Sequence, residues 1–397
     1  MICEKVILQL LGRKKKFFYH DYKKKENIIK KTIQRNRIIV IGGAGSIGFS
    51  VVKLILKYNP LALHIIDINE NKLVELVRYV RSSLGYTKGS FRTFPLDVGS
   101  TGFEAFIKQN DSYDIWLNFS ALKHVRSEKD PFTLMRMIEV NFENTMKILK
   151  LAKTNNAKKF FSVSTDKACD PVSFLGATKR LMELAISSYS HELETSAARF
   201  GNVAFSDGSL LYSVINRMES NQPLVAPLDI KRYFITHEEA ARLSLITAIC
   251  AKSGEIYVPK LSKSIAQSNF PSIIKNFLKF KGYKMLIAKT ENQARALSKK
   301  ANKKSWPCLL FASDTAGEKE EEFFISKEDQ LKKSTFKEIK IINTKKIVKK
   351  SVLLKLIKDI SSIKQKKISE KKIKKIIEGS LKNFKHKYSS KSLEDKM

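Results

Sequence analysis

Short apolar runs alternate with amphipathic stretches through the first half of this sequence. Short apolar runs that are mostly β-branched or aromatic are typical of buried strands. Such runs occur at residues 37–41, 63–66, 91–96, 115–119, 159–163 and 197–200. Apolar positions three and four residues apart predict intervening helices, among them 69–76, 141–155 and 177–187. Repeated strand and helix units predict an α/β fold with a doubly wound, Rossmann-type parallel sheet, which binds its ligand at the carboxyl ends of the strands.

The end of the chain has a different pattern. Apolar residues recur at helical spacing at 353–363 and at 373–381, and lysines fill the other helix faces. One interpretation is a pair of amphipathic helices docked on the main body, and the other is a surface for nucleic acid or anionic lipid. Base-stacking surfaces need aromatic residues, and the tail has only Phe336, Phe384 and Tyr388. We therefore favour docked helices.

The net charge is concentrated at the two ends of the chain. The 397 residues carry 74 Lys plus Arg against 39 Asp plus Glu, a formal net charge of +35. Residues 1–37 hold 12 basic and 3 acidic residues, and residues 327–397 hold 23 and 8, so the ends account for +24. Such a charge suggests a nucleic-acid-binding protein, but most of it lies outside the predicted sheet.

Composition excludes several other classes. Apolar residues make up 43% of the chain, which excludes wholly disordered and collagen-like proteins. Cys3, Cys169, Cys250 and Cys308 form no CxxC pair, so we expect free thiols in a reducing compartment and no metal site. No apolar stretch approaches the roughly 18 to 20 residues of a membrane helix. The expectation is a cytoplasmic protein without a membrane span.

A glycine-rich turn follows the first predicted strand. Gly42, Gly45 and Gly48 stand in the segment GGAGSIG, and apolar positions at helical spacing come next. Strand, glycine turn and helix together are typical of a dinucleotide-binding turn, where the backbone approaches a pyrophosphate at the helix N-terminus. We predict that these glycines, with Ser46 and Ile47, contact a nicotinamide dinucleotide. A plain turn is the alternative for an isolated match.

An acidic residue ends the second predicted strand. Asp67 lies 19 residues after Gly48, a spacing at which a carboxylate can accept hydrogen bonds from the adenosine ribose. No arginine follows it immediately to neutralise a 2′-phosphate, so NAD is favoured and NADP stays open. The alternative role of Asp67 is to cap the helix predicted from residue 69.

The strand predicted at residues 159–163 leads into residues suited to acid–base chemistry. Thr165, Asp166 and Lys167 follow it closely, and Lys179 comes twelve residues after Lys167. Short-chain dehydrogenases use a Ser or Thr hydroxyl at such a strand end to hold the substrate oxygen. They also use a Lys four residues after a Tyr to bind the nicotinamide ribose. Here the Tyr position is Leu175, which can neither donate nor accept a proton.

Five motifs make the resemblance specific. In chain order they are ALKHV at 121–125, STDKA at 164–168, GATKR at 176–180, RFGNV at 199–203 and RYF at 232–234. This series resembles the CapD-type polysaccharide-biosynthesis proteins, extended short-chain dehydrogenase/reductase enzymes that act as UDP-N-acetylglucosamine 4,6-dehydratases. Farther on, residues 313–322 resemble the GEK-x-x-EE segment of the nucleotide-sugar half of that family.

The resemblance implies a reaction in which a tightly bound nicotinamide is regenerated. Hydride leaves C4 of the hexosamine, the C5 proton and the C6 hydroxyl are lost as water, and hydride returns to C6. By resemblance Lys167 is the C5 base, Asp166 the acid for the leaving hydroxyl, and Thr165 the anchor of the C4 oxygen. Burial and the neighbouring cation Lys179 are expected to promote the basic form of Lys167. One branch of the family carries Met at the Tyr position, so with Leu175 here we expect Asp166, Thr165 or a water to relay the C4 proton.

The resemblance also implies binding roles. The residues expected to bind the cofactor are Asp97, Ser120, Ala121 and Lys179. The residues expected to bind the sugar nucleotide are Lys123, His124, Asn141, Arg199, Asn202, Ser209, Arg232 and Glu318. Arginine suits bidentate phosphate binding. The alternatives are N-capping for Asn141, a packed or surface histidine for His124, and a surface salt bridge for Arg232.

Four regions are expected along the chain. They are a basic extension at 1–36, a dinucleotide-binding domain at 37–254, a sugar-nucleotide lobe at 255–330 with 203–230, and a lysine-rich helical tail at 331–397. A UDP-sugar substrate and further copies of this chain are the expected partners; nucleic acid and a membrane are not. Three alternatives stay open: a nucleotide-sugar 4-epimerase, a catalytically silent binder of cofactor and sugar nucleotide, and a nucleic-acid-binding protein.

Overall fold

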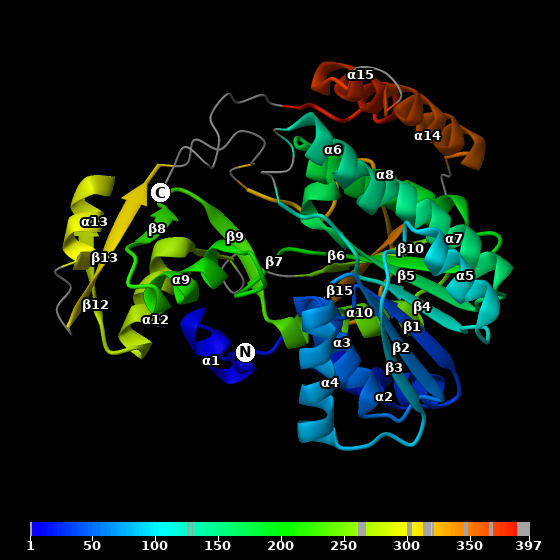
Figure 1. Cartoon of the computed structure of the whole chain (residues 1–397), viewed down its shortest axis with the longest axis horizontal. Helices are drawn as coiled ribbons and strands as arrows, with labels where there is room; N and C mark the ends of the chain where they lie inside the picture. The colour runs from blue at the N-terminus through cyan, green and yellow to red at the C-terminus, as the bar shows by residue number, and fades with distance from the viewer. Residues whose placement is uncertain are drawn as a thin grey trace.

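A nine-stranded sheet forms the centre of the computed structural model (Figure 1). The structure describes residues 2–124, 128, 130–260, 267–299, 304–312, 319, 321–344, 348–364 and 368–386. In spatial order the strands are β14 (Gln330–Lys332), β15 (Ile339–Asn343), β10 (Glu255–Pro259), β6 (Glu194–Phe200), β5 (Lys159–Thr165), β4 (Ile115–Asn118), β1 (Arg37–Ile41), β2 (Ala62–Asp67) and β3 (Ser90–Pro95). The strands from β10 to β3 are parallel, and β15 and β14 extend the sheet antiparallel. The predicted doubly wound parallel sheet is confirmed.

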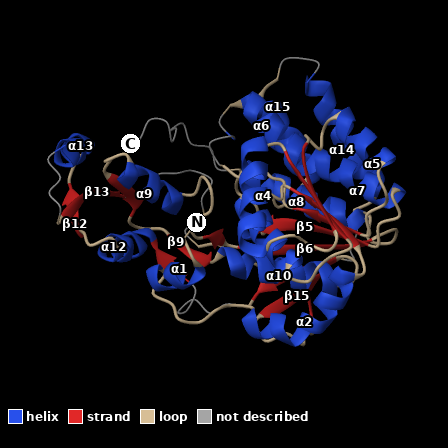
Figure 2. Ribbon diagram, turned by 60° about the horizontal axis from the view of Figure 1, so that its bottom comes forward, coloured by secondary structure: helices blue, strands red, loops and turns tan. Residues whose placement is uncertain are grey.

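Helices cover both faces of this sheet (Figures 1 and 2). One face carries α2 (Tyr19–Gln34), α3 (Ser46–Leu56), α4 (Glu70–Leu84) and α10 (His237–Cys250). The other carries α5 (Thr101–Gln109), α7 (Asn144–Thr154) and α8 (Phe174–Ser188), with α6 (Pro131–Ile138) packed against α8. Because both faces are covered, strand residues such as Ile39, Trp116 and Phe160 are fully buried, which explains the continuous apolar runs.

The helix predicted at 141–155 begins earlier than expected. A π-helical turn, η2 (Glu139–Glu143), joins α6 to α7, so helical structure is continuous from Pro131 to Thr154. Asp130 caps the N-terminus by accepting hydrogen bonds from the backbone N–H groups of Phe132 and Thr133. The predicted start was wrong because Asn141, a common capping residue type, lies inside the helix.

A smaller lobe lies at one end of the large sheet (Figure 1). Its parallel strands are β8 (Leu224–Pro227), β13 (Ser305–Phe311) and β12 (Lys284–Ala288), and its helices are α9 (Leu210–Glu219), α12 (Phe270–Phe280) and α13 (Glu291–Lys299). A three-stranded sheet accompanies them, with β7 (Asn202–Val203), β9 (Lys231–Ile235) and β11 (Gln267–Asn269). The lobe is therefore built from stretches of chain on both sides of α10 and β10.

The basic N-terminal residues are packed into both parts of the molecule. Helix α1 (Glu4–Leu10) places Ile7 in the core of the smaller lobe, and α2 buries Ile29 in the main core. Between the two helices, Arg13 donates two 2.7 Å hydrogen bonds to the buried carboxylate of Glu239 on α10. Part of the positive charge at this end is thus paired inside the protein.

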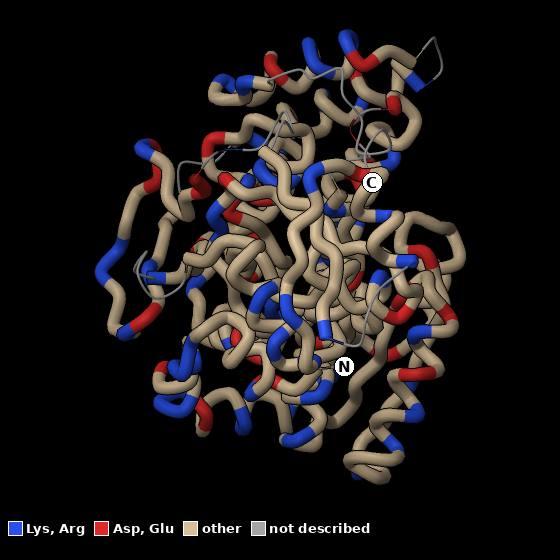
Figure 3. Tube along the Cα trace, turned by 90° about the vertical axis from the view of Figure 1, so that its left-hand side faces the viewer, with Lys and Arg blue, Asp and Glu red and all other residues tan. Residues whose placement is uncertain are grey.

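The two helices predicted near the end of the chain pack on the main body. Helices α14 (Lys350–Lys364) and α15 (Glu370–Ser380) lie outside α6 and α8 (Figure 1). Leu356, Ile360 and Ile377 are at most 2% exposed and belong to the main core, which supports the docked-helix interpretation. Figure 3 shows basic residues spread over many elements with acidic residues among them. Within the described ranges no helix has the length and apolarity needed to span a bilayer.

Candidate active site

The glycine turn joins β1 to α3 with little free space. Gly42 adopts a φ of +71°, and a Cβ there would lie 2.6 Å from the backbone nitrogen of Ser120. A Cβ at Gly48 would lie 2.3 Å from the carbonyl oxygen of Gly42. Gly45 is the N-cap of α3, whose first residue is Ser46. Gly42 and Gly48 therefore require glycine, and the turn leads directly into a helix N-terminus, which favours an anion.

The carboxylate of Asp67 lies directly against this turn. Asp67 ends β2, and its side chain accepts 3.0 Å hydrogen bonds from the backbone N–H groups of Ala44 and Asn69. Asn69, and not Asp67, supplies the side-chain cap of α4 by accepting from Lys72. The carboxylate is therefore held beside the glycine turn, where a ribose hydroxyl can reach it.

Three further predicted cofactor residues lie just after β3 and β4. The Asp97 carboxylate accepts from the backbone of Gly99 at 2.8 Å and pairs with Arg136 at 3.0 Å. Partial burial opposes the charge of Asp97, but these two partners hold its pKa below the ordinary value. The hydroxyl of Ser120 donates to Asn118 at 2.6 Å, and the half-buried Ala121 follows it. The ends of β1, β2, β3 and β4 thus meet at one edge of the sheet.

A buried acid–base group follows β5. Thr165 ends the strand and Asp166 begins the short 3-10 helix η3 (Asp166–Ala168). The Thr165 hydroxyl donates to Oδ1 of Asp166 at 2.8 Å. Asp166 is only 1% exposed, yet its Oδ2 has no hydrogen-bond partner in the described part of the chain. Buried polar atoms are almost always paired, so this oxygen is a candidate acceptor for a hydrogen bond from a water or a ligand.

Lys167 lies beside this carboxylate and beside a second one. Its Nζ is 3.8 Å from Oδ1 of Asp166 and 3.4 Å from Oε1 of Glu322. Two carboxylates favour the ammonium form of a lysine, whereas we expected Lys179 to favour the neutral amine. The GEK-x-x-EE resemblance pointed to the segment containing Glu322 but not to this contact.

Lys179 is buried behind the same strand. It is 4% exposed, and its Nζ donates to the carbonyl oxygen of Val163 at 3.1 Å. Burial lowers its pKa to about 8, with Glu183 acting in the opposite direction. Four residues earlier, Leu175 is 5% exposed and its backbone N–H donates to Glu128. Burial raises the pKa of Glu128 to about 7.

Asn141 holds a loop in place and is not a helix cap. It lies in the π-helical turn η2 and is 1% exposed. Its side chain accepts from the backbone N–H of Leu122 and donates to the Leu122 carbonyl, both at 2.9 Å. It also donates to the hydroxyl of Thr178 on α8 at 3.1 Å. Asn141 therefore fixes the loop that carries Lys123 and His124, and the N-capping alternative is wrong.

The loop before α9 reaches across to the glycine turn. Lys123 donates to Ser206 at 3.4 Å, and burial lowers the pKa of Lys123. The backbone N–H of Asp207 donates to the Ser46 hydroxyl at 2.9 Å. His124 packs on Gly208, where a Cβ would lie 2.6 Å from the imidazole. This loop brings the smaller lobe against the predicted cofactor residues.

Three more of the predicted sugar-nucleotide residues lie in the described part of the chain. Ser209 caps α9 by accepting from Tyr212, and half-buried Asn202 lies on β7. Arg232 on β9 is 2% exposed, so the surface salt bridge considered for it is wrong, and its charge acts on Glu322. Glu318 lies outside the described residues.

Arg199 is not at the site, which corrects the role taken from the resemblance. Its guanidinium is fully buried and donates to both oxygens of Glu183 at 2.7 and 2.8 Å. The same group donates to Asp329 at 2.7 Å and to the carbonyl oxygen of Phe324. These four hydrogen bonds use most of its donors, so Arg199 is a structural cation between β6, α8 and the chain before β14.

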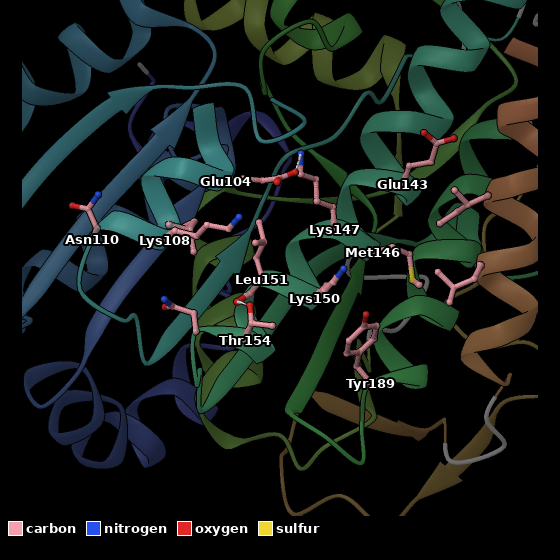
Figure 4. A pocket seen from close by; sticks show the side chains of 14 residues that line it. Glu104, Lys108, Asn110, Glu143, Met146, Lys147, Lys150, Leu151, Thr154 and Tyr189 are labelled. Carbon is pink, nitrogen blue, oxygen red and sulfur yellow. Dashed lines mark hydrogen bonds and ion pairs between the residues drawn. The ribbon is translucent and has the colours of Figure 1, made fainter. Parts of the chain in front are cut away.

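A groove of about 720 Å³ lies elsewhere, between α5, α7 and α14 (Figure 4). Lys147, which lines it, pairs with Glu104 at 2.6 Å, and Glu143 pairs with Lys364 at 2.9 Å. None of the predicted site residues lines this groove. The groove is therefore separate from the predicted site at the strand ends.

Comparison with known proteins gives a family match over most of the chain. Residues 38–344 match the family described as "Polysaccharide biosynthesis protein". An uncharacterized membrane protein of Methanocaldococcus jannaschii is 34% identical over 254 residues, 62% of this chain and 73% of that protein. The capsular polysaccharide biosynthesis protein CapD of Staphylococcus aureus is 30% identical over 65% of this chain, which spans only 43% of CapD. A UDP-N-acetylglucosamine 4,6-dehydratase (inverting) of Campylobacter jejuni is 28% identical over 56% of this chain and 66% of that enzyme.

Solved structures share the fold. The X-ray structure of Pen from Bacillus thuringiensis superimposes with a TM-score of 0.64 at 21% identity. The alignment covers 80% of this chain and 90% of that one.

Proposed function

The chain belongs to the polysaccharide biosynthesis protein family, and from this premise we propose that it is a nucleotide-sugar 4,6-dehydratase acting on UDP-N-acetylglucosamine. One observation carries the proposal: the buried carboxylate of Asp166 has a hydroxyl and a lysine near its Oδ1, while its Oδ2 has no hydrogen-bond partner among the described residues. The named dehydratase among its relatives supports this reaction. Dehydration needs an acid, a base and a hydroxyl anchor in one site.

The glycine turn suits a nicotinamide dinucleotide. Gly42, Gly45, Gly48 and the N-terminus of α3 form a cradle that a Cβ would obstruct at Gly42 and Gly48, and Asp67 lies at its rim. We propose that these residues, with Ser46 and Ile47, hold the pyrophosphate and adenosine ribose of NAD, and that Lys179 lies toward the nicotinamide ribose. When bound, the dinucleotide supplies the hydride acceptor for C4 and the donor for C6.

The residues after β5 divide the proton transfers between them. Thr165 holds the C4 oxygen, and Lys167 as a neutral amine takes the C5 proton. The electron pair of the C5–H bond forms the C5=C6 double bond, while Asp166 in its protonated form gives a proton to the C6 hydroxyl, which leaves as water. The unpaired Oδ2 of Asp166 is the oxygen available for that contact.

The hydrogen bond between Thr165 and Asp166 supplies a proton path where Leu175 replaces tyrosine. The hydroxyl donates to the carboxylate at 2.8 Å, so a proton from the C4 hydroxyl can pass through Thr165 to Asp166. Lys123 and Arg232 are the cations proposed for the sugar nucleotide, because a diphosphate needs positive charge. Arg232 is buried and its charge acts on Glu322, and Lys123 contacts Ser206 on the loop that reaches the glycine turn.

The test is to incubate the purified protein with UDP-N-acetylglucosamine and follow the product by NMR. A 4-keto-6-deoxy sugar that gains solvent deuterium at C5 in D₂O is expected. An epimerase would instead keep the C6 oxygen and invert C4. The proposal would be contradicted if the substrate stayed unchanged and if denaturing the purified protein released no nicotinamide dinucleotide into the extract.

A further inference from the structure

The chain that follows the smaller lobe brings a second carboxylate to the catalytic lysine. The Glu322 side chain is 2% exposed, and its Oε1 lies 3.4 Å from Nζ of Lys167. The Lys167 side chain is 17% exposed. Its amine thus lies close to two carboxylates, those of Glu322 and Asp166.

Lys319 connects Glu322 to the residues just after Lys167. Its Oε2 is 3.8 Å from Nζ of Lys319. Lys319 also donates to the carbonyl oxygen of Cys169, two residues after Lys167. The neighbouring Glu321 accepts from Gln267 on β11 at 3.3 Å. The carboxylate therefore comes to the lysine on a segment attached both to η3 and to the smaller lobe.

The charges around Glu322 couple its proton to that of Lys167. Burial raises the pKa of Glu322, and Lys167 is the strongest of the groups that lower it. Asp166 raises it further, while Lys319 and Arg232 lower it. Groups in such contact titrate together. Moreover, Oε2 of Glu322 makes no hydrogen bond within the described part of the chain, so the charge of Lys167 is a principal stabilising partner for the carboxylate.

We propose that Glu322 is a positioning residue for the base: its carboxylate holds the Lys167 amine in place and sets the pH at which that amine loses its proton. This inference rests on the dehydratase function proposed above. When Lys167 takes the C5 proton, the new ammonium lies beside the carboxylate, which stabilises it without touching the sugar. Glu322 therefore makes Lys167 a stronger base, at the expense of keeping it protonated to higher pH.

The first test measures Lys167 itself, in the ligand-free protein. The rate of acetylation of Lys167 by acetic anhydride is followed by mass spectrometry as a function of pH. Removing a carboxylate next to an ammonium should lower the midpoint of this pH dependence by about one pH unit or more in Glu322→Gln. The matched control Glu321→Gln should keep the wild-type midpoint, and Glu322→Asp, which keeps the charge at a longer distance, should fall between them. A Glu322→Asp or Glu322→Gln midpoint equal to wild type would overturn the inference.

The second test separates this inference from the proposed function. With UDP-N-acetylglucosamine, the acidic limb of the kcat/KM profile of Glu322→Gln should move to lower pH, and the plateau rate should fall because the base is weaker. A merely structural role would lower the rate at all pH values and leave the limb in place. A wild-type protein without turnover, but with a shifted acetylation midpoint in the variant, would contradict the dehydratase and leave the lysine–glutamate pair standing.

Discussion

Two buried charged clusters lie near the ends of β5 and β6, and they differ in whether their polar atoms are paired. In the first, Arg199 donates to both oxygens of Glu183 and to Asp329, and Ser164 donates to Glu183 at 2.7 Å. In the second, Asp166 and Glu322 each keep one carboxylate oxygen without a hydrogen bond among the described residues. The first cluster is complete as it stands, whereas the second has room for a further donor.

This difference separates stability from chemistry within one small region. A complete buried network stabilises the fold as long as all its members are present. An incomplete one costs stability, and such a cost is typically tolerated where a ligand or reaction uses the free groups. Variants in the first cluster should therefore affect unfolding, and variants in the second should affect turnover.

The largest effect is expected from Asp166→Asn. Loss of the acid should lower kcat by about 10²- to 10⁴-fold, measured by NMR of the product. Unfolding by urea should show equal or higher stability, because a buried carboxylate with an unpaired oxygen has been neutralised. Asp170→Asn, an exposed carboxylate four residues later, is the control and should keep wild-type turnover. A stability loss of several kcal/mol in Asp166→Asn would place Asp166 with the structural cluster.

Arg199→Met should have the largest effect on folding. It leaves the carboxylates of Glu183 and Asp329 buried without their main partner, which costs about 3 to 5 kcal/mol. Urea unfolding at neutral pH measures this loss. Arg180→Met removes a partly exposed partner of the same Glu183 and should cost less than about 1 kcal/mol. If Arg199→Met instead unfolds like wild type and only loses affinity for the sugar nucleotide, Arg199 belongs to the site.

Acid should weaken the complete cluster over a defined pH range. Burial alone would raise the pKa of Glu183, but Arg199 outweighs it and the pKa is lowered from 4.5 to about 2. The unfolded chain therefore binds the proton first, so this stabilisation is present above pH 4.5 and is lost as pH falls toward 2. It amounts to about 3 kcal/mol. The stability difference between wild type and Glu183→Gln should shrink by that amount between pH 5 and pH 2, and a constant difference would contradict the pairing.

The smallest effect is expected from Leu175→Met. The exchange nearly conserves volume, so it should cost less than about 1.5 kcal/mol of stability. Neither side chain can donate a proton. Turnover of UDP-N-acetylglucosamine should stay close to wild type if Thr165 and Asp166 relay the C4 proton. A matched Thr165→Val variant should reduce kcat, because it removes the relay hydroxyl. Full activity in Thr165→Val would exclude that path.

Features carried by neighbouring residues could be predicted from the sequence. The doubly wound sheet follows from alternating apolar runs, and the glycine turn needs only Gly42, Gly45 and Gly48 in one segment, since the backbone geometry there depends on local sterics. Thr165, Asp166 and Lys167 are adjacent in the chain, so the end of β5 brings them together. The docked helices α14 and α15 were recognisable by the same logic from their apolar stripes.

Contacts between distant segments could not be predicted in this way. Arg199 has the residue type of a phosphate ligand, but Glu183 and Asp329 occupy it. Asn141 has the type of a helix cap, but the helix begins at Pro131 and leaves Asn141 to hold Leu122. Residue type limits the bonds a side chain can make, and the packing of the rest of the chain selects among them.

Local order along the chain therefore determined the sheet, the glycine turn and the acid–base residues after β5, because each depends on sterics or periodicity within a few residues. Which charges are paired and which stay open was decided only when β5, β6, α8 and the segment with Glu322 came together. Burial makes pairing decisive, since an unpaired polar atom inside the protein is costly. For this reason Asp166 and Arg199, both charged and both buried, are expected to have different roles.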